Sequence, residues 1–190
     1  MLDRFLDLAM AHDGPPAEIP DGASPAELVL SLPAHLRDAV AARVPGAPST
    51  ADVFRRLLEG AKRGVKIFSP YVDPTFTAYA QMAKAPIQII TTVRELRGRA
   101  SGVLERLSTA RPVAVRYLHE RQARAQMFQL HAKMILSDAT LAYVGSANFT
   151  DTSLHYNFEL GVVSADRSVI ERLHSLFDYL WDFAARPMRP

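Results

Sequence analysis

The chain has 190 residues, which suits one α/β domain with an appendage or two very small domains. Hydrophobic residues make up 48% of the sequence and cysteine is absent, so global disorder, a disulfide scaffold, a thiolate zinc site and a cysteine nucleophile are excluded. The formal net charge of +2 hides an uneven distribution, because residues 92–133 hold nine basic and only three acidic side chains.

The N-terminus contains early acidic residues and lacks the clean apolar stretch of a secretory signal. No apolar run approaches the roughly 18 residues that a membrane span requires. We therefore expect a soluble, cytoplasmic protein without a membrane anchor.

Residues 1–48 are predicted to form a small helical N-terminal appendage. Helical spacing of apolar residues begins at Leu2, and a second helical segment follows Ser24, a suitable N-cap, with Pro33 dividing that segment into two helices. The turn-forming stretch PGAPST then marks a domain boundary. The main domain is predicted to cover residues 49–190, and the acidic appendage is interpreted as a packing or partner-docking element.

Helical and strand patterns alternate through the main domain. Ser49 and Asp166 are expected to cap the first and last helices, and Gly64 is expected to follow the end of the first. Expected helices cover residues 51–64, 74–85, 102–110 and 166–184, and expected strands cover residues 65–72, 86–93, 112–118, 128–136, 140–147 and 158–165. This alternation predicts α/β layers.

The middle of the chain is rich in arginine, a side chain that holds phosphate through two parallel hydrogen bonds. A solvated helix face is one explanation for such a run. Because few acids interleave, we favour an anionic, phosphate-bearing partner for this segment, which contains Arg94, Arg97, Arg99, Arg106, Arg111, Arg116, Arg121 and Arg124.

Two neighbouring segments carry polar side chains inside apolar runs. His131 and Lys133 are two residues apart, as are Ser146 and Asn148, and this spacing puts each pair on one face of a strand. If the strands pair through the intervening turn, all four side chains converge, and Gly145 lets the backbone approach a ligand closely. An imidazole, an ammonium, a hydroxyl and a carboxamide suit a phosphate, because one group attacks while the others bind its oxygens.

The spacing of these residues resembles the HKD motif of the phospholipase D superfamily, H-x-K-x4-D-x6-G-S-x-N. Every fixed position of the pattern is filled, by His131, Lys133, Asp138, Gly145, Ser146 and Asn148. The resemblance covers roughly residues 50–185 and implies a phospholipase D-like mixed sheet flanked by helices. Glu159 stands where that superfamily has a downstream acid.

The resemblance implies a metal-independent phosphodiesterase that needs no cofactor. His131 would attack phosphorus and form a phosphohistidine, and a second HKD histidine would protonate the leaving oxygen. Only one motif is present, so the resemblance implies a homodimer in which two His131 rings share one active site. Lys133, Ser146 and Asn148 would bind the nonbridging oxygens, while Glu159 would accept a hydrogen bond from the far nitrogen of a His131 ring.

Other polar and aromatic residues receive structural interpretations. Asp138 lies in the expected turn, where it should point away from the pocket and hold the hairpin through hydrogen bonds. His155 is interpreted as a loop histidine, and Ser69 to Tyr71 as part of the pocket rim. Aromatic side chains of the last helix are interpreted as packing groups: Phe177, Tyr179, Trp181 and Phe183.

The favoured substrate is DNA or RNA, bound with little sequence specificity, because of the arginine-rich segment, the missing anchor and the single motif. A phospholipid hydrolase, acting on phosphatidyl lipids or cardiolipin, and a non-catalytic nucleic-acid-binding subunit of a defence complex remain alternatives. The helical prefix on one HKD unit is similar to the phospholipase-D-like subunit of the bacterial DISARM antiphage system. That similarity implies antiphage defence, with other defence-system proteins as partners.

Overall fold

The computed structural model describes residues 26–92, 102, 104, 112–118, 122–123, 126–127 and 130–187. Most of the helix expected at 102–110 and most of the arginine-rich segment lie outside the described residues, as does the start of the N-terminal appendage.

An eight-stranded mixed sheet forms the centre of the molecule, in the order β1-β9-β8-β7-β2-β3-β4-β10. Neighbouring strands β2, β3 and β4 run parallel, and all other pairs are antiparallel. The strands are β1 Glu27–Ser31, β2 Val65–Phe68, β3 Ile87–Thr92, β4 Val113–Leu118, β7 Met134–Ser137, β8 Leu141–Gly145, β9 Glu159–Ser164 and β10 Ala185–Pro187, with a separate small pair, β5 Gln122–Ala123 and β6 Gln126–Met127. The mixed sheet flanked by helices agrees with the expected fold class.

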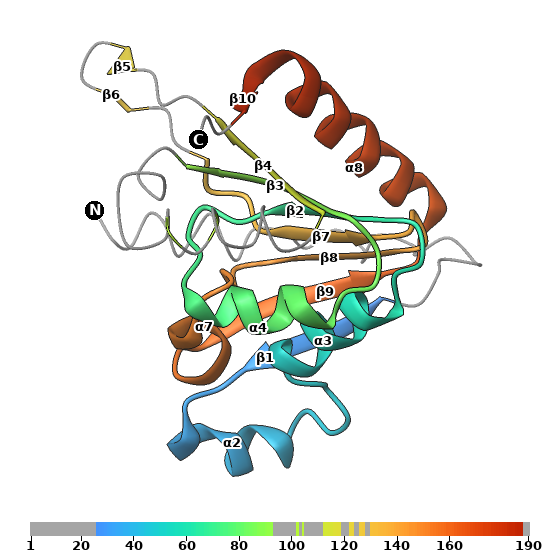
Figure 1. Ribbon diagram of the computed structural model, residues 1–190. Helices are drawn as coiled ribbons and strands as arrows, with labels where there is room; N and C mark the ends of the chain where they lie inside the picture. The colour runs from blue at the N-terminus through green and yellow to red at the C-terminus, as the bar shows by residue number, and fades with distance from the viewer. Residues whose placement is uncertain are drawn as a thin grey trace, which may run out of the picture.

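Helices cover both faces of this sheet (Figure 1), with α3 and α4 on one face and α8 on the other. The described helices are α2 Ala34–Ala41, α3 Thr50–Gly60, α4 Pro74–Met82, α7 Asp151–His155 and α8 Arg167–Tyr179, which continues as the π-helix η1 Leu180–Ala184. One apolar cluster lies beneath α3 and α4 and includes Phe54, Ile67 and Tyr143. A second lies beneath α8 and includes Phe68, Met134 and Phe177.

The helix caps expected at Ser49 and Asp166 are confirmed, for α3 and α8. The Ser49 side chain accepts a hydrogen bond from the Asp52 backbone N–H at 3.1 Å, and the Asp166 carboxylate accepts one from the Val169 N–H at 2.9 Å. The expected end of the first helix is wrong, because α3 stops at Gly60 and the chain is already extended at Ala61. Residue 64 is instead the last before β2.

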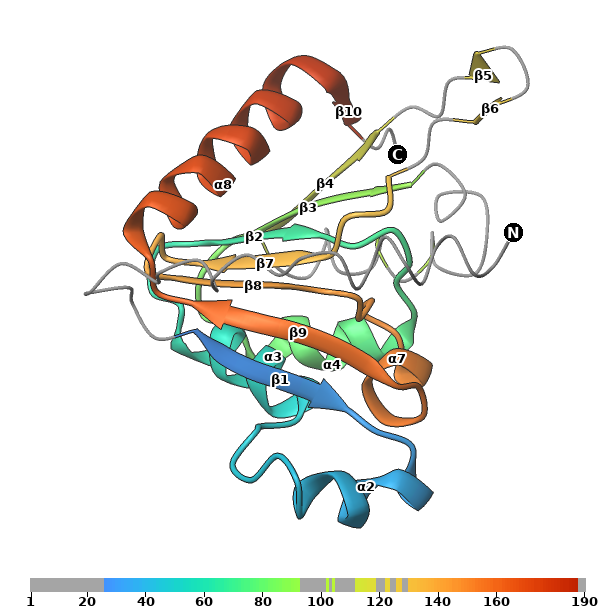
Figure 2. The same cartoon turned by 180° about the vertical axis from the view of Figure 1, so that it is seen from behind.

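The helix expected after Ser24 is wrong over Glu27–Ser31, which forms strand β1. Figure 2 shows β1 lying along β9 at the edge of the sheet, antiparallel, with Leu28 opposite Val162. The segment between Pro25 and Pro33 is too short to form a stable helix by itself. Pairing with the edge of β9 instead satisfies its backbone N–H and C=O groups. The helix that follows Pro33 is confirmed as α2, although none of its residues is buried. The division between an appendage and a main domain stays a prediction.

The C-terminal helix agrees only in part with the packing role expected of its aromatic residues. Phe177 and Trp181 are buried and stacked, with ring centroids 5.6 Å apart. Tyr179 and Phe183 are 61% and 78% exposed, so the expectation is wrong for them. Arg116 of β4 lies over the Trp181 ring, 4.6 Å from its centroid, and donates to the Trp181 carbonyl oxygen. This arginine therefore stabilises the fold.

Candidate active site

The strand ends place the motif residues at one end of the sheet, which we call the site end. Phe68 at the end of β2 pairs with Met134 at the start of β7, and Met134 pairs with Val144 near the end of β8. Gly145 in turn pairs with Gly161 near the start of β9. The residues that precede β7, follow β8 and begin β9 therefore meet at this end.

His131 and Lys133 lie just before β7, and not inside the strand as expected. The chain is still held against β8 there, because the Gly145 N–H donates to the Lys133 carbonyl at 3.3 Å. The Lys133 ammonium lies 3.1 Å from each ring nitrogen of His131 and donates to the His131 carbonyl oxygen at 2.8 Å. The imidazole is exposed, so a ligand can reach it beside a fixed positive charge.

Lys133 is only 6% exposed, which is unusual for a lysine. Burial lowers its pKa, and the negative charge of Glu159 partly offsets that effect. A buried ammonium with a nearby carboxylate is a fixed, poorly solvated cation, and such a group binds an anionic ligand more strongly than an exposed lysine does.

Ser146 and Glu159 are joined directly across the sheet. The Ser146 hydroxyl donates to one oxygen of the Glu159 carboxylate and accepts from the Leu160 N–H at 3.1 Å. The other carboxylate oxygen accepts from the Asn157 side-chain amide at 3.2 Å. Glu159 is 8% exposed. The expected hydrogen bond between Glu159 and His131 does not form within the chain, where both residues are described, so it stays a prediction for a pair of chains.

Asn148 reaches the same end of the sheet, held between the buried side chains of Ala147 and Phe149. Its side-chain oxygen is buried and has no hydrogen-bond partner among the described residues. A buried unpaired carboxamide oxygen is costly, so its placement is evidence for a role other than stability. Ser69 ties the chain after β2 to the segment after Asn148, because its hydroxyl accepts from the Phe149 N–H at 3.2 Å and donates to the Tyr71 carbonyl at 2.7 Å. Ser69 and Tyr71 are not among the residues that line the groove beside His131, so their place on a pocket rim stays a prediction.

Asp138 lies at the opposite end of β7, in the turn before β8, with a positive φ of 54°. Its carboxylate accepts three backbone hydrogen bonds, from Lys62 at 2.6 Å, Arg63 at 2.7 Å and Gly64 at 3.0 Å. Burial alone would raise the pKa of Asp138, but these bonds and the Arg63 charge outweigh burial and lower it. As expected, the Asp138 carboxylate points away from the groove; its hydrogen bonds tie the turn to the residues before β2, and any role of Asp138 in the motif stays a prediction.

Gly145 has a packing role that differs from the close ligand approach expected of it. A Cβ atom there would lie 2.7 Å from the Leu160 carbonyl oxygen and nearer still to the ring of Tyr143. A Cβ atom at Gly161 would meet the same ring. The two glycines make room for a fully buried tyrosine below the site.

An open groove of about 360 Å³ runs beside the candidate residues on the α8 side of the sheet. His131, Lys133 and Ser146 form its polar part. The remaining wall is mostly apolar and comes from Phe68, Ala132, Met134, Val144, Gly145, Leu173 and Leu176.

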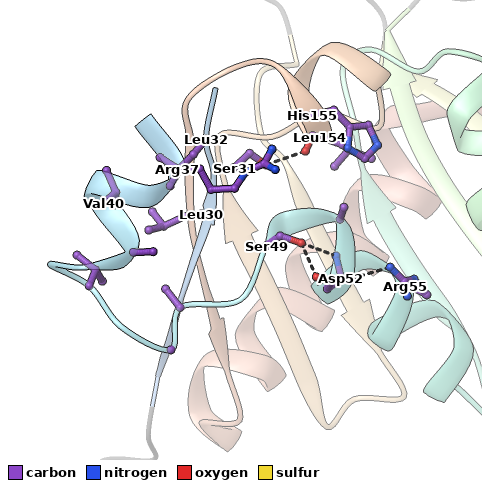
Figure 3. Close-up of a pocket in the computed structure, with 15 residues that line it drawn as sticks. Leu30, Ser31, Leu32, Arg37, Val40, Ser49, Asp52, Arg55, Leu154 and His155 are labelled. Atoms are coloured by element: carbon purple, nitrogen blue, oxygen red, sulfur yellow. Dashed lines mark hydrogen bonds and ion pairs between the residues drawn. The ribbon is translucent and has the colours of Figure 1, made fainter. Parts of the chain in front are cut away.

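His155 does not line this groove. It ends α7, 3.8 Å from the carboxylate of Asp151, and borders a different cavity of about 490 Å³ beneath α2 (Figure 3). That cavity also contacts Ser31, Arg37 and Leu154, and the Ser31 hydroxyl donates to the Leu154 carbonyl at 3.3 Å. His155 is therefore separate from the motif residues.

Comparison with family models matches residues 49–181 to the PLD-like domain described for cardiolipin synthase. This match covers more than half of the 190 residues. The chain belongs to the phospholipase D superfamily. No curated protein sequence matches it.

Solved structures share the phospholipase D-like fold at low sequence identity. NucT from Helicobacter pylori is 16% identical, with a TM-score of 0.67 over 86% of this chain and 100% of that one. Nuc, a phospholipase D family member from Salmonella typhimurium, is 18% identical, with a TM-score of 0.61 over 87% and 99%. Phosphatidylserine synthase from Haemophilus influenzae Rd KW20 is 12% identical, with a TM-score of 0.60 over 86% and 40%.

Sequence reasoning missed two features of this phospholipase D-like site. The side-chain amide of Asn157 supports Glu159, and the neighbours of Asn157 in the sequence, Tyr156 and Phe158, are exposed. The sequence contains a signal for this arrangement. Asn157 stands between two aromatic residues and shortly before Glu159, and aromatic residues are not typical of a plain turn.

No helix among the described residues is long and apolar enough to cross a membrane.

Proposed function

We propose that the protein is a metal-independent phosphodiesterase, a nuclease that cleaves DNA or RNA through a phosphohistidine at His131. The observation that carries this proposal is the pairing of an exposed imidazole with the buried ammonium of Lys133 at an open groove. Ser146, Glu159 and the unpaired oxygen of Asn148 lie at the same end of the sheet. A nucleophile beside fixed polar groups is the arrangement that phosphoryl transfer requires.

In the proposed reaction a ring nitrogen of His131 attacks phosphorus, and the bond from phosphorus to the leaving oxygen breaks. His131 of the partner subunit donates a proton to that leaving oxygen. The same ring then removes a proton from water, and the resulting hydroxide breaks the phosphorus–nitrogen bond and frees His131. Lys133 neutralises charge on the nonbridging oxygens, and Glu159 orients the ring of the partner histidine.

The second histidine requires a second copy of the chain, and an exposed surface beside the groove supports this. Four apolar side chains of β1, β8 and β9, which we call the apolar face, are 38–51% exposed: Leu28, Val144, Leu160 and Val162. Val144 and Leu28 both pair with Val162, so these side chains share one side of the sheet, and Val144 also lines the groove. A contiguous exposed apolar surface is typical of an interface. We propose that a second copy covers it.

A nucleic acid is favoured over other phosphodiesters because of charge. Strands β3 and β4 both end at the site end, and the segments that follow them in the sequence contain seven of the eight middle arginines. Phosphate contacts by arginine give binding with little sequence preference and a strong dependence on salt. A role in antiphage defence, with other defence proteins as partners, is part of the same proposal.

A phospholipid substrate is the second candidate, because the groove beside His131 has a largely apolar wall. The likeness to phosphatidylserine synthase and the family description that names cardiolipin synthase point the same way. An acyl chain could lie along Leu173 and Leu176 while its phosphate meets Lys133.

The deciding experiment offers single- and double-stranded DNA, RNA and phosphatidylglycerol–cardiolipin vesicles to the protein, with and without EDTA. We expect cleavage of nucleic acid that EDTA leaves unchanged, and an acid-labile, alkali-stable phosphate label on the protein. His131→Ala should abolish both but retain binding, whereas His35→Ala, an exposed histidine of α2, should change neither. Cleavage of lipid alone would favour the second candidate, and binding without any turnover would identify a non-catalytic subunit.

A further inference from the structure

Exposed aromatic rings gather at the site end of the sheet. Among the described residues, the exposed tyrosine and phenylalanine side chains are Tyr71 at 37%, Tyr156 at 65%, Phe158 at 61%, Tyr179 at 61% and Phe183 at 78%. Tyr71 follows β2, while Tyr179 and Phe183 precede β10, whose first residue pairs with the end of β4. Tyr71, Tyr156 and Phe158 therefore lie beside strand ends that meet at the site end, whereas Tyr179 and Phe183 lie towards the opposite edge of the sheet, next to β10.

Tyr156 and Phe158 are the exposed aromatic residues nearest to Glu159 along the chain, and the Tyr156 ring also lies edge-on to His155, with 6.5 Å between the ring centroids. They flank Asn157, whose side chain holds Glu159, the acceptor of the Ser146 hydroxyl. The backbone around them is anchored, because the Tyr156 and Asn157 N–H groups both donate to the Thr152 carbonyl, at 3.0 and 2.9 Å. Their rings are thus presented from a fixed segment next to the polar residues.

The alternation along β9 indicates which side of the sheet Phe158 lies on. Leu160 and Val162 point to the same side as Val144, which lines the groove, whereas Glu159 is buried. Phe158 directly precedes the first residue of β9 and Leu160 by two positions, so continuing the alternation of the strand would put its ring on the groove side. Phe158 does not line the groove itself, so a polymer whose phosphate lies at His131 would reach this ring by continuing past the groove towards the start of β9.

We propose that Tyr156 and Phe158 form a stacking platform for unpaired bases, and that the preferred substrate is therefore a single-stranded nucleic acid. This inference rests on the proposed function. Bases in a duplex already stack on one another, so exposed rings favour a strand whose bases are free. Base–aromatic stacking contributes about five- to 150-fold in affinity per base, and it tolerates any sequence.

The test compares three ligands in a His131→Ala background, where binding is measured without cleavage: a single-stranded oligonucleotide, its duplex, and an abasic strand of equal length. We expect tighter binding of the single strand than of the duplex. Replacing Tyr156 and Phe158 together with alanine should weaken single-strand binding at least tenfold and leave the abasic strand unchanged. Met82→Ala removes a 37% exposed side chain at the far end of α4 and should have no effect.

A second measurement reads stacking directly. The chain has one tryptophan, Trp181, which is 8% exposed, so a tryptophan introduced by Phe158→Trp reports its own surroundings as a difference from the parent. Its fluorescence should be quenched by the single strand and not by the abasic strand. Equal weakening of both strands by the double substitution, or a change from dimer to monomer in light scattering, would overturn the platform. The latter would assign Phe158 to the contact between copies.

The two proposals fail in different ways. Absence of turnover on every substrate, with base-dependent binding intact, would reject the nuclease and keep the platform. Turnover of duplex and single strands at equal rates, unaffected by the alanine pair, would reject the platform and keep the nuclease.

Discussion

The Lys133 ammonium is equidistant from the two ring nitrogens of His131, at 3.1 Å from each, and is itself almost completely buried. The histidine ring is exposed while its companion charge is not. The positive charge is thus held in place by the protein before any ligand arrives, and the His131 ring remains accessible to that ligand.

This pairing predicts a characteristic alkaline limit to activity. Because burial lowers the pKa of Lys133, its ammonium loses its proton at a lower pH than an ordinary lysine, whose pKa is about 10.4. We expect kcat/KM to fall on the alkaline side below that value. Lys133→Ala should reduce kcat/KM by about 100-fold or more, as removal of a charge-stabilising group does. An alkaline limb that is unchanged in Lys133→Arg, where the cation cannot titrate, would contradict the assignment.

The Ser146–Glu159 hydrogen bond predicts a positioning role for the acid. Glu159→Gln keeps the size of the side chain but replaces a charged acceptor, so we expect kcat to fall at least tenfold with little change in Tm. Glu171→Gln is the matched control, because its carboxylate forms only an exposed ion pair with Arg167. A fall in Tm that parallels the loss of activity would make Glu159 a structural residue instead.

The three backbone hydrogen bonds to Asp138 predict a stability effect at the turn. Asp138→Ala should lower the free energy of unfolding by about 2 kcal/mol, because three backbone N–H groups lose their acceptor. The pKa of Asp138 is lowered in the folded protein, so this stabilisation is present above the unfolded pKa of about 3.9 and is lost as pH falls through the folded pKa. Chemical denaturation at neutral and acidic pH measures both, with the exposed Asp182→Ala for comparison.

The space that Gly145 leaves for Tyr143 predicts a steric effect inside the motif. Gly145→Ala should destabilise the protein by about 1–3 kcal/mol, as overpacking of a core does, since the added methyl meets a buried ring and a backbone carbonyl. Gly60→Ala, at the end of α3 with open space around it, should be neutral or slightly stabilising. Equal melting temperatures for the two variants would refute this explanation of the glycine.

The apolar face predicts a link between assembly and activity. Val162→Glu should convert a dimer into a monomer in light scattering and abolish turnover, because a charge cannot be buried without a partner. Val169→Glu is the control, because Val169 is 44% exposed and Val162 is 43% exposed. Val169 lies in the first turn of α8, where an acidic side chain is tolerated, so this variant should stay dimeric and active. A fully active monomer would reject the shared site.

Much of the fold could be predicted because periodicity and caps act locally. Ser49 and Asp166 cap helices through their own backbone neighbours, so sequence spacing was sufficient to find them. The strand at Glu27–Ser31 could not be found that way, because it depends on pairing with β9 more than 120 residues later. The exposure of Tyr179 and Phe183 likewise depends on which side of α8 meets the sheet.

The motif spacing predicted which polar residues would gather, but not how they would bond. His131 and Lys133 were expected in a strand and precede it, since β7 starts at Met134. The contact of Glu159 with Ser146 within one chain had no counterpart in the sequence pattern. The motif pattern also could not explain why a glycine is needed at position 145. The glycine leaves space for the ring of Tyr143, two residues earlier, and this packing is visible only in the structure.

The two outermost strands of the sheet, β1 at Glu27–Ser31 and β10 at Ala185–Pro187, both lie beyond the residues 49–181 that match the family. A protein shortened to residues 49–181 would lack both edge strands, and the backbone donors and acceptors of β9 and β4 that pair with them would be left unsatisfied. Exposed edge strands of this kind pair with strands of other molecules. A shortened chain should therefore keep both β1 and β10, because without them we expect fibrous or insoluble material in place of folded protein.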